Sequence, residues 1–273
     1  MHAVVLTWNG AHLLPEALDA LRRQDAPARL HLVVADNASS DGTRELLARS
    51  YPEVEHLRLS ENLGYGRANN EAMRRALEAG ADFVALINND VEAAPDWLRK
   101  LLEAAGAHPE AGLFAGTLLF RGEEVVNSTG LEIDAFGRAR DRDFRVPLSR
   151  LSREDGPVAG VSGGAALLRV SLLRQVGLFD PAYFAYYEDV DLSLRAVQAG
   201  SQSWYVRGAV ARHQPALKAA ALVPLTVLYR AAVKAPLELL RVRPALAWAE
   251  LRAAAEGGAA ALRAFSDRSR SPR

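Results

Sequence analysis

The sequence predicts an α/β fold, with a mostly parallel central sheet that carries helices on both faces, followed by a C-terminal helical appendage. Between residues 3 and 105, short apolar runs alternate with helical patterns, as they do in βαβ units. Turns rich in Asn, Asp and Gly follow these apolar runs. After residue 215 the chain becomes basic and rich in Ala and Leu, which marks a separate segment.

The elements follow in a regular order through the first part of the chain. Strands are expected over residues 3–6, 30–35, 54–59 and 83–87, and helices over residues 13–21, 43–48, 68–79 and 95–105. Residues 112–170 contain strands, glycines and charged loops, from which we expect antiparallel additions to the sheet edge. A helix over residues 190–199 and a short strand over residues 204–206 complete the sheet domain. We assign residues 1–215 to this domain, 216–265 to amphipathic helices and 266–273 to a disordered tail.

Composition and charge exclude several classes of protein. The chain has 273 residues with 33 Lys and Arg against 33 Asp and Glu, and this zero net charge argues against a nucleic-acid-binding protein. The absence of Cys rules out disulfides, Cys-based zinc sites and thiol catalysis. The sequence shows no targeting signal and no apolar run near the ~18 residues of a spanning helix, so we expect a cytoplasmic protein.

Polar residues gather at the predicted carboxyl ends of the strands, where parallel α/β sheets bind their ligands. Thr7 and Asn9 follow the first strand, Asp36 to Asp41 the second, Asn62 to Asn70 the third, and Asn88 to Asp90 the fourth. Each set alone would be a turn or a helix cap, but four sets at one edge indicate a binding site. A dinucleotide-binding fold is disfavoured, because Gly64-x-Gly66 follows the third strand and lacks the third glycine of the fingerprint.

Two residues suggest a divalent metal. Asp90 ends the run Asn88-Asn89-Asp90 and leaves one carboxylate at the edge of a buried strand. Mg²⁺ or Mn²⁺ is commonly held by one or two carboxylates together with substrate phosphates. His213 follows the last predicted strand, opposite the acidic edge. A lone His is usually structural, and this position strengthens the case for a metal role.

Three carboxylates lie within four positions at the N-terminus of the last predicted helix of the sheet domain, at Glu188, Asp189 and Asp191. Acidic side chains are favoured at a helix N-terminus, so helix capping is one interpretation. A cap needs one acid, however, and three repel one another. Their position after an aromatic run favours a site in which one carboxylate acts as a base. Upstream, Ser162-Gly163-Gly164 has little side-chain bulk, which lets a ligand approach the backbone.

Taken together, these segments resemble the inverting family 2 glycosyltransferases, most closely the bacterial rhamnosyltransferase-type members. The resemblance runs from Val4 to about His213. It is carried by Val4-Val5-Leu6-Thr7-Trp8-Asn9-Gly10, Asp36-Asn37-x-Ser39-x-Asp41-Gly42, Asn62-x-Gly64-Tyr65, Asn88-Asn89-Asp90, Ser162-Gly163-Gly164, Gly177-x-Phe179-Asp180 and Tyr187-Glu188-Asp189-Val190-Asp191. Each motif is short, but their order and spacing are specific to that family.

The resemblance implies a GT-A fold, a nucleotide-diphosphate-sugar donor and a glycan or lipid-linked acceptor in polysaccharide or cell-envelope synthesis. It places Asp36 at the nucleotide base and assigns the nucleotide-sugar site to Thr7, Asn9, Asp41, Asn62, Gly64, Asn70, Asn88 and Asn89. It puts Ser162, Gly163 and Gly164 on the acceptor side, Asp90 and His213 on Mg²⁺ or Mn²⁺, Asp189 as general base, and Glu188 and Asp191 around it. Asn88 departs from the family, which usually has an acid there, and Gln214-Pro215 replaces the usual small residues.

Two further function classes and the basic tail complete the expectations. A nucleotidyltransferase needs a Gly-rich basic loop after the first strand, which is absent. A non-catalytic sugar-nucleotide sensor would have lost Asp90, Asp189 or His213, and all three are present. Residues 216–273 carry ten Lys and Arg against four Asp and Glu. Arg230, Lys234 and Arg241 fall on one helical stripe, which suits either the inner face of an anionic membrane or the acidic body of the protein.

Overall fold

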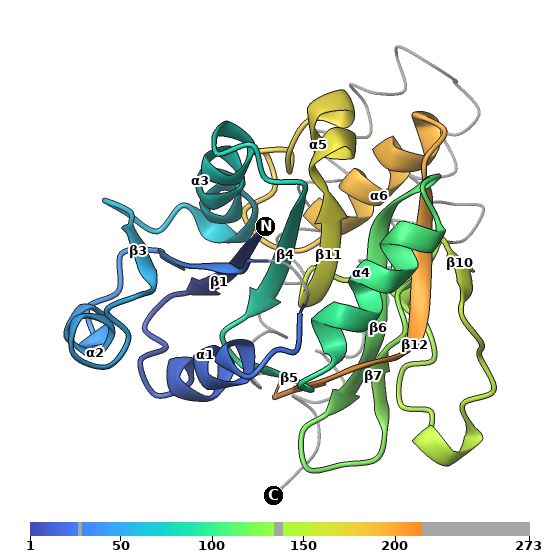
Figure 1. The fold of residues 1–273 in the computed structure, drawn as a ribbon, viewed down its shortest axis with the longest axis horizontal. Coiled ribbons are helices and arrows are strands. Elements are labelled where there is room, and N and C mark those ends of the chain that lie inside the picture. Colours follow the sequence, from blue (N-terminus) through green and yellow to red (C-terminus); the bar gives the residue numbers. More distant parts are fainter. Residues whose placement is uncertain (27–28, 134–138, 215–273) are drawn as a thin grey trace, which may run out of the picture. The chain divides into compact units, whose positions relative to one another are not determined.

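The computed structural model describes residues 1–26, 29–133 and 139–214 (Figure 1). Its strands are β1 (His2–Thr7), β2 (His31–Asp36), β3 (Glu55–Arg58), β4 (Phe83–Asn88), β5 (Val91–Ala93), β6 (Ala111–Phe120), β7 (Val126–Ser128), β8 (Leu131–Ile133), β9 (Ala139–Asp141), β10 (Gly156–Val158), β11 (Ala165–Arg169) and β12 (Gln202–His213). Its helices are α1 (Leu14–Arg22), α2 (Thr43–Ser50), α3 (Gly64–Glu78), α4 (Trp97–Ala107), α5 (Val170–Val176) and α6 (Glu188–Gln198).

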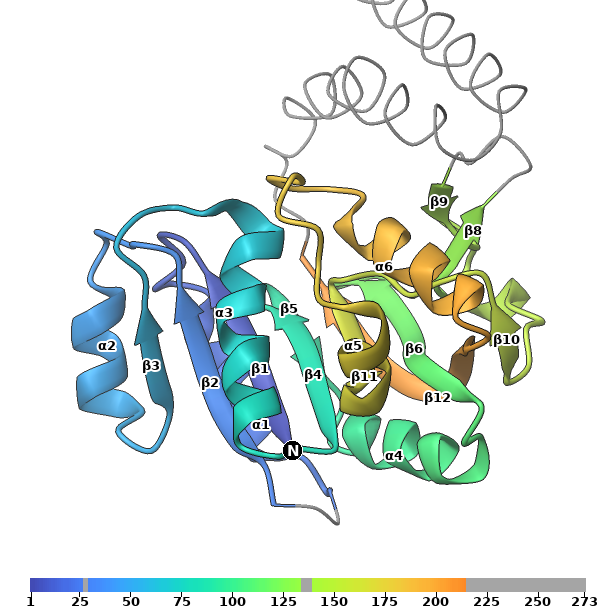
Figure 2. The ribbon, with the colours of Figure 1, turned by 90° about the horizontal axis from the view of Figure 1, so that it is seen from above.

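The predicted α/β sheet is confirmed. Strands follow the order β10-β12-β6-β11-β4-β1-β2-β3, with β5 paired to β12 and β7 paired to β6. Strands β1, β2, β3 and β4 run parallel, as do β6 and β12, whereas β11 is antiparallel to both of its neighbours. The carboxyl ends of β1, β2 and β4 therefore meet at one edge, which Figure 2 shows from above.

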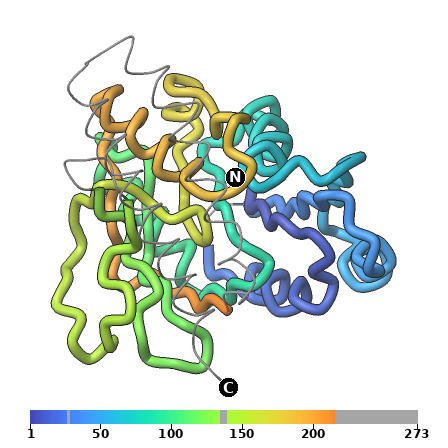
Figure 3. The backbone as a smooth tube through the Cα atoms, turned by 180° about the vertical axis from the view of Figure 1, so that it is seen from behind, coloured from blue at the N-terminus to red at the C-terminus, as the bar shows by residue number. Residues whose placement is uncertain are grey.

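Helices cover both faces of the sheet because successive strand residues point to opposite sides. Val5 belongs to an apolar cluster with α1, α2 and α4, whereas Val4 belongs to a second cluster with α3, α5 and α6. Figure 1 views the face with α1 and α4, and Figure 3 views the opposite face. Both faces of the central strands are thus buried, which explains their nearly continuous apolar sequences.

The region after α4 differs from the expectation in three ways. The antiparallel strand β11 lies inside the sheet, between β4 and β6, because Ala165 to Leu168 are buried on both sides. Strand β12 is much longer than the predicted residues 204–206, since a register shift between Val206 and Val210 lets it continue to His213. Helix α5 has only seven residues, too few to show a helical period in the sequence.

Two boundaries of the predicted elements also move, and both changes affect the site. Helix α3 begins at Gly64 rather than near residue 68, and α6 begins at Glu188 rather than near residue 190. Glu188 and Asp189 therefore lie in the first turn of a helix. The boundary at residue 215, the amphipathic helices over 216–265 and the tail over 266–273 lie outside the described residues and stay predictions. Within the described ranges, no helix has the length and apolarity that a membrane span requires.

Candidate active site

The ends of three parallel strands bring the first predicted residues together. Thr7 at the end of β1 pairs in register with Asp36 of β2, and Asn88 ends β4 on the other side of β1. The side-chain amide of Asn89 donates to Thr7 Oγ1 at 2.9 Å. The Asn88 backbone N–H donates to the Gly164 carbonyl at 2.9 Å, which joins this edge to the loop before β11.

Asp36 is fully buried and saturated with hydrogen-bond donors. Its carboxylate accepts the Ser39 N–H at 2.8 Å, Arg58 Nη1 at 2.8 Å and His56 Nε2 at 3.0 Å. Burial alone would raise the pKa of Asp36, but the hydrogen bonds from Ser39 and His56 and the charge of Arg58 outweigh it and lower the pKa. The carboxylate thus holds the turn after β2, while the partly exposed Arg58 faces solvent beside it.

The turns after β1 and β2 are tied to each other. The Asn9 backbone N–H donates to Ser39 Oγ at 2.9 Å, and Asn9 Oδ1 accepts the Ser40 N–H at 2.8 Å. Asp41 accepts the Ala11 N–H at 2.9 Å and the Thr43 hydroxyl at 2.6 Å. Asn9 and Asp41 therefore fix the shape of this edge through the backbone.

The turn after β3 is built around close backbone approaches. Asn62 Oδ1 accepts the side-chain amide of Asn37 at 2.7 Å, which joins the second and third turns. Gly64 has φ +79°, and a Cβ there would overlap the carbonyl of Phe184. Asn70 is buried and exchanges two hydrogen bonds with the backbone of Phe179, at 2.8 and 3.0 Å. Gly64 and Asn70 thus hold the loop that precedes α6.

Asp90 and His213 come together, as their positions in the sequence suggested. His213 ends β12 beside Val91 of β5, and its Nε2 lies 3.2 Å from Asp90 Oδ1. His213 Nδ1 lies 3.0 Å from Asn127 Oδ1, and in the tautomer that donates to this oxygen the Nε2 atom presents its lone pair. Among the described residues, Asp90 Oδ1 is buried without a hydrogen bond of good geometry, which fits an oxygen reserved for a cation.

Glu188 and Asp189 lie in the first turn of α6, where Glu188 is buried and Asp189 is partly buried. Asp189 Oδ2 accepts the Gly163 N–H at 2.9 Å and Oδ1 accepts the Val190 N–H at 2.8 Å. Burial raises the pKa of Asp189 to about 6 despite these two hydrogen bonds, and the charge of Asp141 adds to the rise. Burial and the charge of Asp189 raise the pKa of Glu188 to about 8, which favours its protonated form at neutral pH.

The third acid of this group, Asp191, has a different environment. It accepts two donors of Arg195 at 2.9 Å, and the same guanidinium also donates to the carbonyls of Val176 and Leu178. Asp191 thereby anchors the loop after α5 to α6. Asp191 therefore stabilises the packing of this loop on α6, whereas Asp189 contacts the loop over residues 162–164.

Gly163 lies close to both Asp189 and Tyr65. The Tyr65 hydroxyl donates to the Gly163 carbonyl at 2.6 Å, and a Cβ on Gly163 would lie 3.0 Å from that hydroxyl. Gly164 accepts from Asn88, and Ser162 lies beside it. The predicted acceptor-side segment thus forms the wall between the end of β4 and the start of α6.

The sequence did not indicate several residues of this edge. Arg58 and His56 hold Asp36, Asn127 holds His213, and Asp141 of β9 acts on the pKa of Asp189. Arg58 and His56 alternate with apolar residues in β3, a pattern that could have placed both on the Asp36 side. Asp141 lies in the charged stretch Arg140 to Arg145, where no sequence pattern distinguishes it from the second carboxylate, Asp143.

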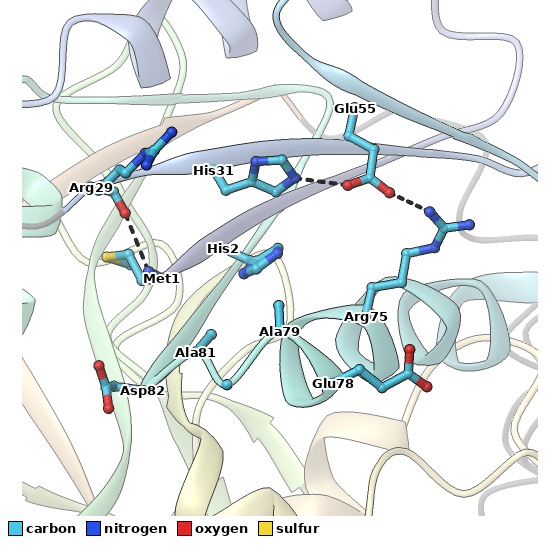
Figure 4. Close-up of a pocket in the computed structure, with 11 residues that line it drawn as sticks. Met1, His2, Arg29, His31, Glu55, Arg75, Glu78, Ala79, Ala81 and Asp82 are labelled. Atoms are coloured by element: carbon cyan, nitrogen blue, oxygen red, sulfur yellow. Dashed lines mark hydrogen bonds and ion pairs between the residues drawn. The ribbon is translucent and has the colours of Figure 1, made fainter.

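The opposite edge of the sheet carries a pocket of about 770 Å³, shown in Figure 4. Its lining includes His2, His31, Glu55 and Arg75. Glu55 accepts His31 Nε2 at 2.7 Å and also pairs with Arg75. Burial raises the pKa of Glu55, but the hydrogen bonds from His31 and Arg75 outweigh it and lower the pKa. This pocket lies at the amino ends of the parallel strands, away from the edge where α/β sheets bind their ligands.

The fold is that of the GT-A glycosyltransferases. The mannosyltransferase PcManGT from Pyrobaculum calidifontis, solved with GDP-Man and Mn²⁺, superimposes with a TM-score of 0.61 at 20% identity, covering 100% of this chain and 76% of that one. S. aureus TarS gives a TM-score of 0.60 at 17% identity, covering 83% of this chain and 39% of that one. At these identities the likeness concerns the fold alone.

The family follows from the sequence comparison. The profile of glycosyl transferase family 2 matches residues 3–177, and the chain belongs to this family, as the motifs predicted. An N-acetylglucosaminyl-diphospho-decaprenol L-rhamnosyltransferase of Mycobacterium tuberculosis is 34% identical over 205 residues, which are 68% of this chain and 66% of that protein. The galactofuranosyltransferase GlfT1 of Mycolicibacterium smegmatis is 30% identical over 206 residues, 72% of this chain and 65% of that protein. The chain therefore spans slightly less than two thirds of these relatives.

Proposed function

We propose that this protein is an inverting glycosyltransferase that moves a sugar from a nucleotide diphosphate to a hydroxyl of a glycan or lipid-linked acceptor in cell-envelope polysaccharide synthesis. One observation carries the proposal: the same edge of the sheet has one carboxylate suited to bind a cation, Asp90, and another suited to take a proton, Asp189. Asp90 has a buried oxygen without a good hydrogen-bond donor among the described residues and lies beside His213. Asp189 has a raised pKa and lies across the 162–164 wall. The named activity of the Mycobacterium tuberculosis relative supports this class of donor and acceptor.

The donor would bind over the carboxyl ends of β1, β2 and β4. Thr7, Asn9, Asp41, Asn62, Asn88 and Asn89 line or shape this surface. The carboxylate of Asp36 is buried and already accepts three hydrogen bonds. Asp36 would therefore contribute to binding of the nucleotide base by holding Arg58 in place. Arg58 is the partly exposed member of this group and can donate to a base carbonyl.

Asp90 Oδ1 and His213 Nε2 would hold Mg²⁺ or Mn²⁺ together with diphosphate oxygens. An oxygen ligand and an imidazole suit Mn²⁺ well, and a hard cation that keeps substrate oxygens needs few protein ligands. When bound, the cation would neutralise charge on the diphosphate leaving group. Asn127 would contribute by accepting the Nδ1 proton of His213, which orients the ring with Nε2 toward the cation.

Asp189 would take the proton from the acceptor hydroxyl, and the resulting oxygen would attack the anomeric carbon. As that C–O bond forms, the bond to the diphosphate breaks and its electron pair leaves with the diphosphate. Attack from the side opposite the leaving group inverts the anomeric configuration in one step. Glu188 stays protonated beside Asp189, so only one of the two carboxylates is charged in the pocket at neutral pH.

A screen of nucleotide-diphosphate sugars tests the proposal. The melting temperature is measured with each donor, with and without Mn²⁺, because a ligand that binds only the folded state raises it. We expect one nucleotide class to stabilise the protein only when Mn²⁺ is present. The stabilising donor is then incubated with a short-chain N-acetylglucosaminyl-diphospho-lipid, and the anomeric configuration of the product is read by NMR. Retention of configuration, or the absence of any stabilising nucleotide, would contradict the proposal.

A further inference from the structure

We propose that Tyr65 is a positioning residue for Asp189, because its hydroxyl fixes Gly163, whose backbone N–H holds the carboxylate of Asp189. The inference rests on the proposed function, in which Asp189 is the general base. It assigns a role to a side chain of α3 that neither binds the donor nor takes a proton in the proposed reaction.

The wall over residues 162–164 depends on side chains from other elements. These residues belong to no helix or strand, so regular pairing does not hold their backbone. On the α6 side, Ser193 Oγ lies 3.3 Å from the Val161 N–H that donates to it. On the α3 side, the Tyr65 hydroxyl donates to the Gly163 carbonyl at 2.6 Å. The position of the wall is therefore decided by such contacts, because backbone polar groups away from water need partners.

Gly163 uses both of its backbone polar groups at this place. Its N–H donates to Asp189 Oδ2 at 2.9 Å, and its carbonyl accepts the Tyr65 hydroxyl at 2.6 Å, which is short for a hydrogen bond between oxygens. A change in the direction of the carbonyl also moves the N–H of the same residue. Hydrogen bonds weaken steeply when their geometry worsens. The contact with Tyr65 therefore controls how well Gly163 holds Asp189.

Tyr65 is itself held firmly in the first turn of α3. Its N–H donates to the Phe184 carbonyl at 2.6 Å, and its own carbonyl accepts the side-chain amide of Asn69 at 3.1 Å. Its ring contacts the buried ring of Phe179, with 6.2 Å between the ring centroids. Phe184 lies in the loop that precedes α6. Tyr65 thus joins this loop, through its backbone, to the wall in front of Asp189, through its hydroxyl.

The space around Gly163 shows how closely the two residues fit. A Cβ on Gly163 would lie 3.0 Å from the Tyr65 hydroxyl oxygen and 3.4 Å from its ring. Gly163 is not among the glycines with positive φ, so its backbone conformation suits other residues as well. The close approach of Tyr65, rather than the backbone angle, therefore favours glycine at this position.

This contact has an electrostatic consequence for the base. Burial raises the pKa of Asp189, and the Gly163 hydrogen bond is the strongest interaction that opposes the rise. The acidic neighbours Glu188 and Asp141 do not offer such opposition. A weaker Gly163 hydrogen bond would raise the pKa further and leave more of the base protonated. Tyr65 thus helps to keep Asp189 ionised and ready to accept a proton.

The pH profile of Tyr65→Phe tests this role, since the variant keeps the ring and loses only the hydroxyl. We expect the acidic limb of kcat/KM to move up by about 0.5–1 pH unit, so that kcat/KM at pH 5 falls about 3- to 10-fold. The donor KM and the Mn²⁺-dependent nucleotide binding should change less than about twofold. A purely structural loss would lower activity at every pH and leave the limb in place.

Tyr205→Phe is the matched control. Tyr205 is buried in β12, and its hydroxyl lies 2.7 Å from Thr117 Oγ1. The control removes one hydrogen-bonded hydroxyl of the same kind without touching the wall, so its limb should stay at the wild-type position. An equal shift of the limb in Tyr205→Phe would overturn the proposal.

A second substitution, Gly163→Ala, tests the contact from the other side. In the wild type the new Cβ conflicts with the Tyr65 hydroxyl, so the limb should move up as it does in Tyr65→Phe. In the Tyr65→Phe background the hydroxyl is gone, and Gly163→Ala should add little, because residues in contact give non-additive effects. Full additivity of the two shifts would mean that Tyr65 and Gly163 act independently. Gly163→Ala also provides the same readout if Tyr65→Phe proves too unstable to assay.

A titration that needs no turnover separates this inference from the proposed function. The Asp189 carboxyl is followed by NMR in protein with ¹³C-labelled aspartate, and its signal is identified by its loss in Asp189→Asn. We expect a midpoint of about 6 in the wild type and a midpoint about 0.5–1 pH unit higher in Tyr65→Phe. If the wild type binds nucleotide yet transfers no sugar, the proposed function is wrong, and this titration alone decides on Tyr65. An unchanged midpoint in Tyr65→Phe would overturn the proposal.

Discussion

Asp36 and Asp189 lie at the same edge of the sheet, Asp36 fully buried and Asp189 partly buried, and their surroundings differ. Asp36, on the side of β1 to β3, accepts hydrogen bonds from Ser39, His56 and Arg58, and these interactions lower its pKa. Asp189, on the side of α6, accepts two backbone N–H groups, has Glu188 and Asp141 as acidic neighbours, and its pKa is raised. We call these two regions the paired side and the unpaired side of the edge.

The difference separates two uses of a buried carboxylate. On the paired side, cationic donors stabilise the charged form, so Asp36 contributes to folding and to the shape of the site. On the unpaired side, the charged form is destabilised, so Asp189 gains affinity for a proton and suits a general base. Desolvation acts to raise the pKa of both acids. The Arg and His side chains beside Asp36, which Asp189 lacks, decide that the net shift of Asp36 is downward.

The largest effect is expected from removing the base on the unpaired side. Asp189→Asn keeps the size of the side chain and can keep one of its two backbone hydrogen bonds, but it cannot take a proton, so kcat should fall by about 10³-fold or more. Mn²⁺-dependent nucleotide binding, measured by the shift in melting temperature, should be retained. Asp25→Asn is the control, because Asp25 follows α1 with a side chain that is 80% exposed. Turnover close to that of the wild type in Asp189→Asn would show that another group is the base.

The next effect concerns Asp90, whose buried oxygen faces His213. Asp90→Asn removes the charge that would hold the cation, and we expect the Mn²⁺ requirement for nucleotide binding to disappear along with most of that binding. The apparent affinity for nucleotide should drop by about 10²-fold, as is typical when a metal ligand or its support is lost. Isothermal titration with and without Mn²⁺ measures this, and unchanged Mn²⁺-dependent binding would remove Asp90 from the metal site.

The pH dependence of the reaction should report the raised pKa of Asp189. The base must be ionised, so kcat/KM should fall about tenfold per pH unit below a pKa of about 6. Asp141→Asn removes a negative neighbour and should move this limb to lower pH. A flat profile between pH 5 and about 8 would mean that proton transfer to Asp189 does not limit the reaction.

Sequence patterns predicted the fold and the acidic groups of both sides because each depends on local signals. The alternation of strands and helices, the carboxyl-end turns around Asp36 and Asp90, and the acidic start of the helix at Asp189 are each encoded in a contiguous segment. The antiparallel strand β11 was expected at the edge and lies inside the sheet, since strand order is decided by pairing between distant segments. Its apolar residues fit a central strand as well as an edge strand.

The partners of the acids were less accessible to sequence reasoning. Arg58 lies 22 positions from Asp36, and Asn127 lies 86 positions from His213. Such contacts appear only after the strands are placed side by side. The sequence therefore identified the carboxylates, whereas the sign of each pKa shift required the structure, because it depends on cations and acids brought in by other strands.

Stability should respond in opposite ways on the two sides. Asp36→Asn leaves Arg58 without its carboxylate and should lower the free energy of unfolding by about 2–4 kcal/mol at pH 7. The wild type has this contribution above the unfolded Asp pKa of about 3.9 and loses it as pH falls through the lowered folded pKa. Chemical denaturation at pH 7 and near pH 3 measures both values, and the gap between variant and wild type should shrink in acid.

Glu188→Gln should behave in the reverse sense. The folded pKa of Glu188 is raised to about 8, so its contribution is fully present below the unfolded pKa near 4 and is lost as pH rises through about 8. The neutral amide avoids this loss, and the variant should equal or exceed the wild type in melting temperature at pH 9. A variant that is less stable than the wild type at pH 9 by as much as at pH 5 would show that Glu188 is not protonated in the fold.

The smallest effect is expected at the opposite edge of the sheet, where Glu55 pairs with His31 and Arg75. These side chains are partly exposed, and exposed ion pairs contribute about 0–1 kcal/mol. Arg75→Ala should therefore change the free energy of unfolding by less than about 1 kcal/mol, and it should leave kcat and both KM values at their wild-type levels. The pocket of Figure 4 is also hollow, but its acid Glu55 is already paired with His31 and Arg75. If Arg75→Ala lost sugar transfer while nucleotide binding stayed intact, the pocket of Figure 4 would take part in the reaction. The absence of a cation beside a carboxylate would then not be what identifies the active edge of the sheet.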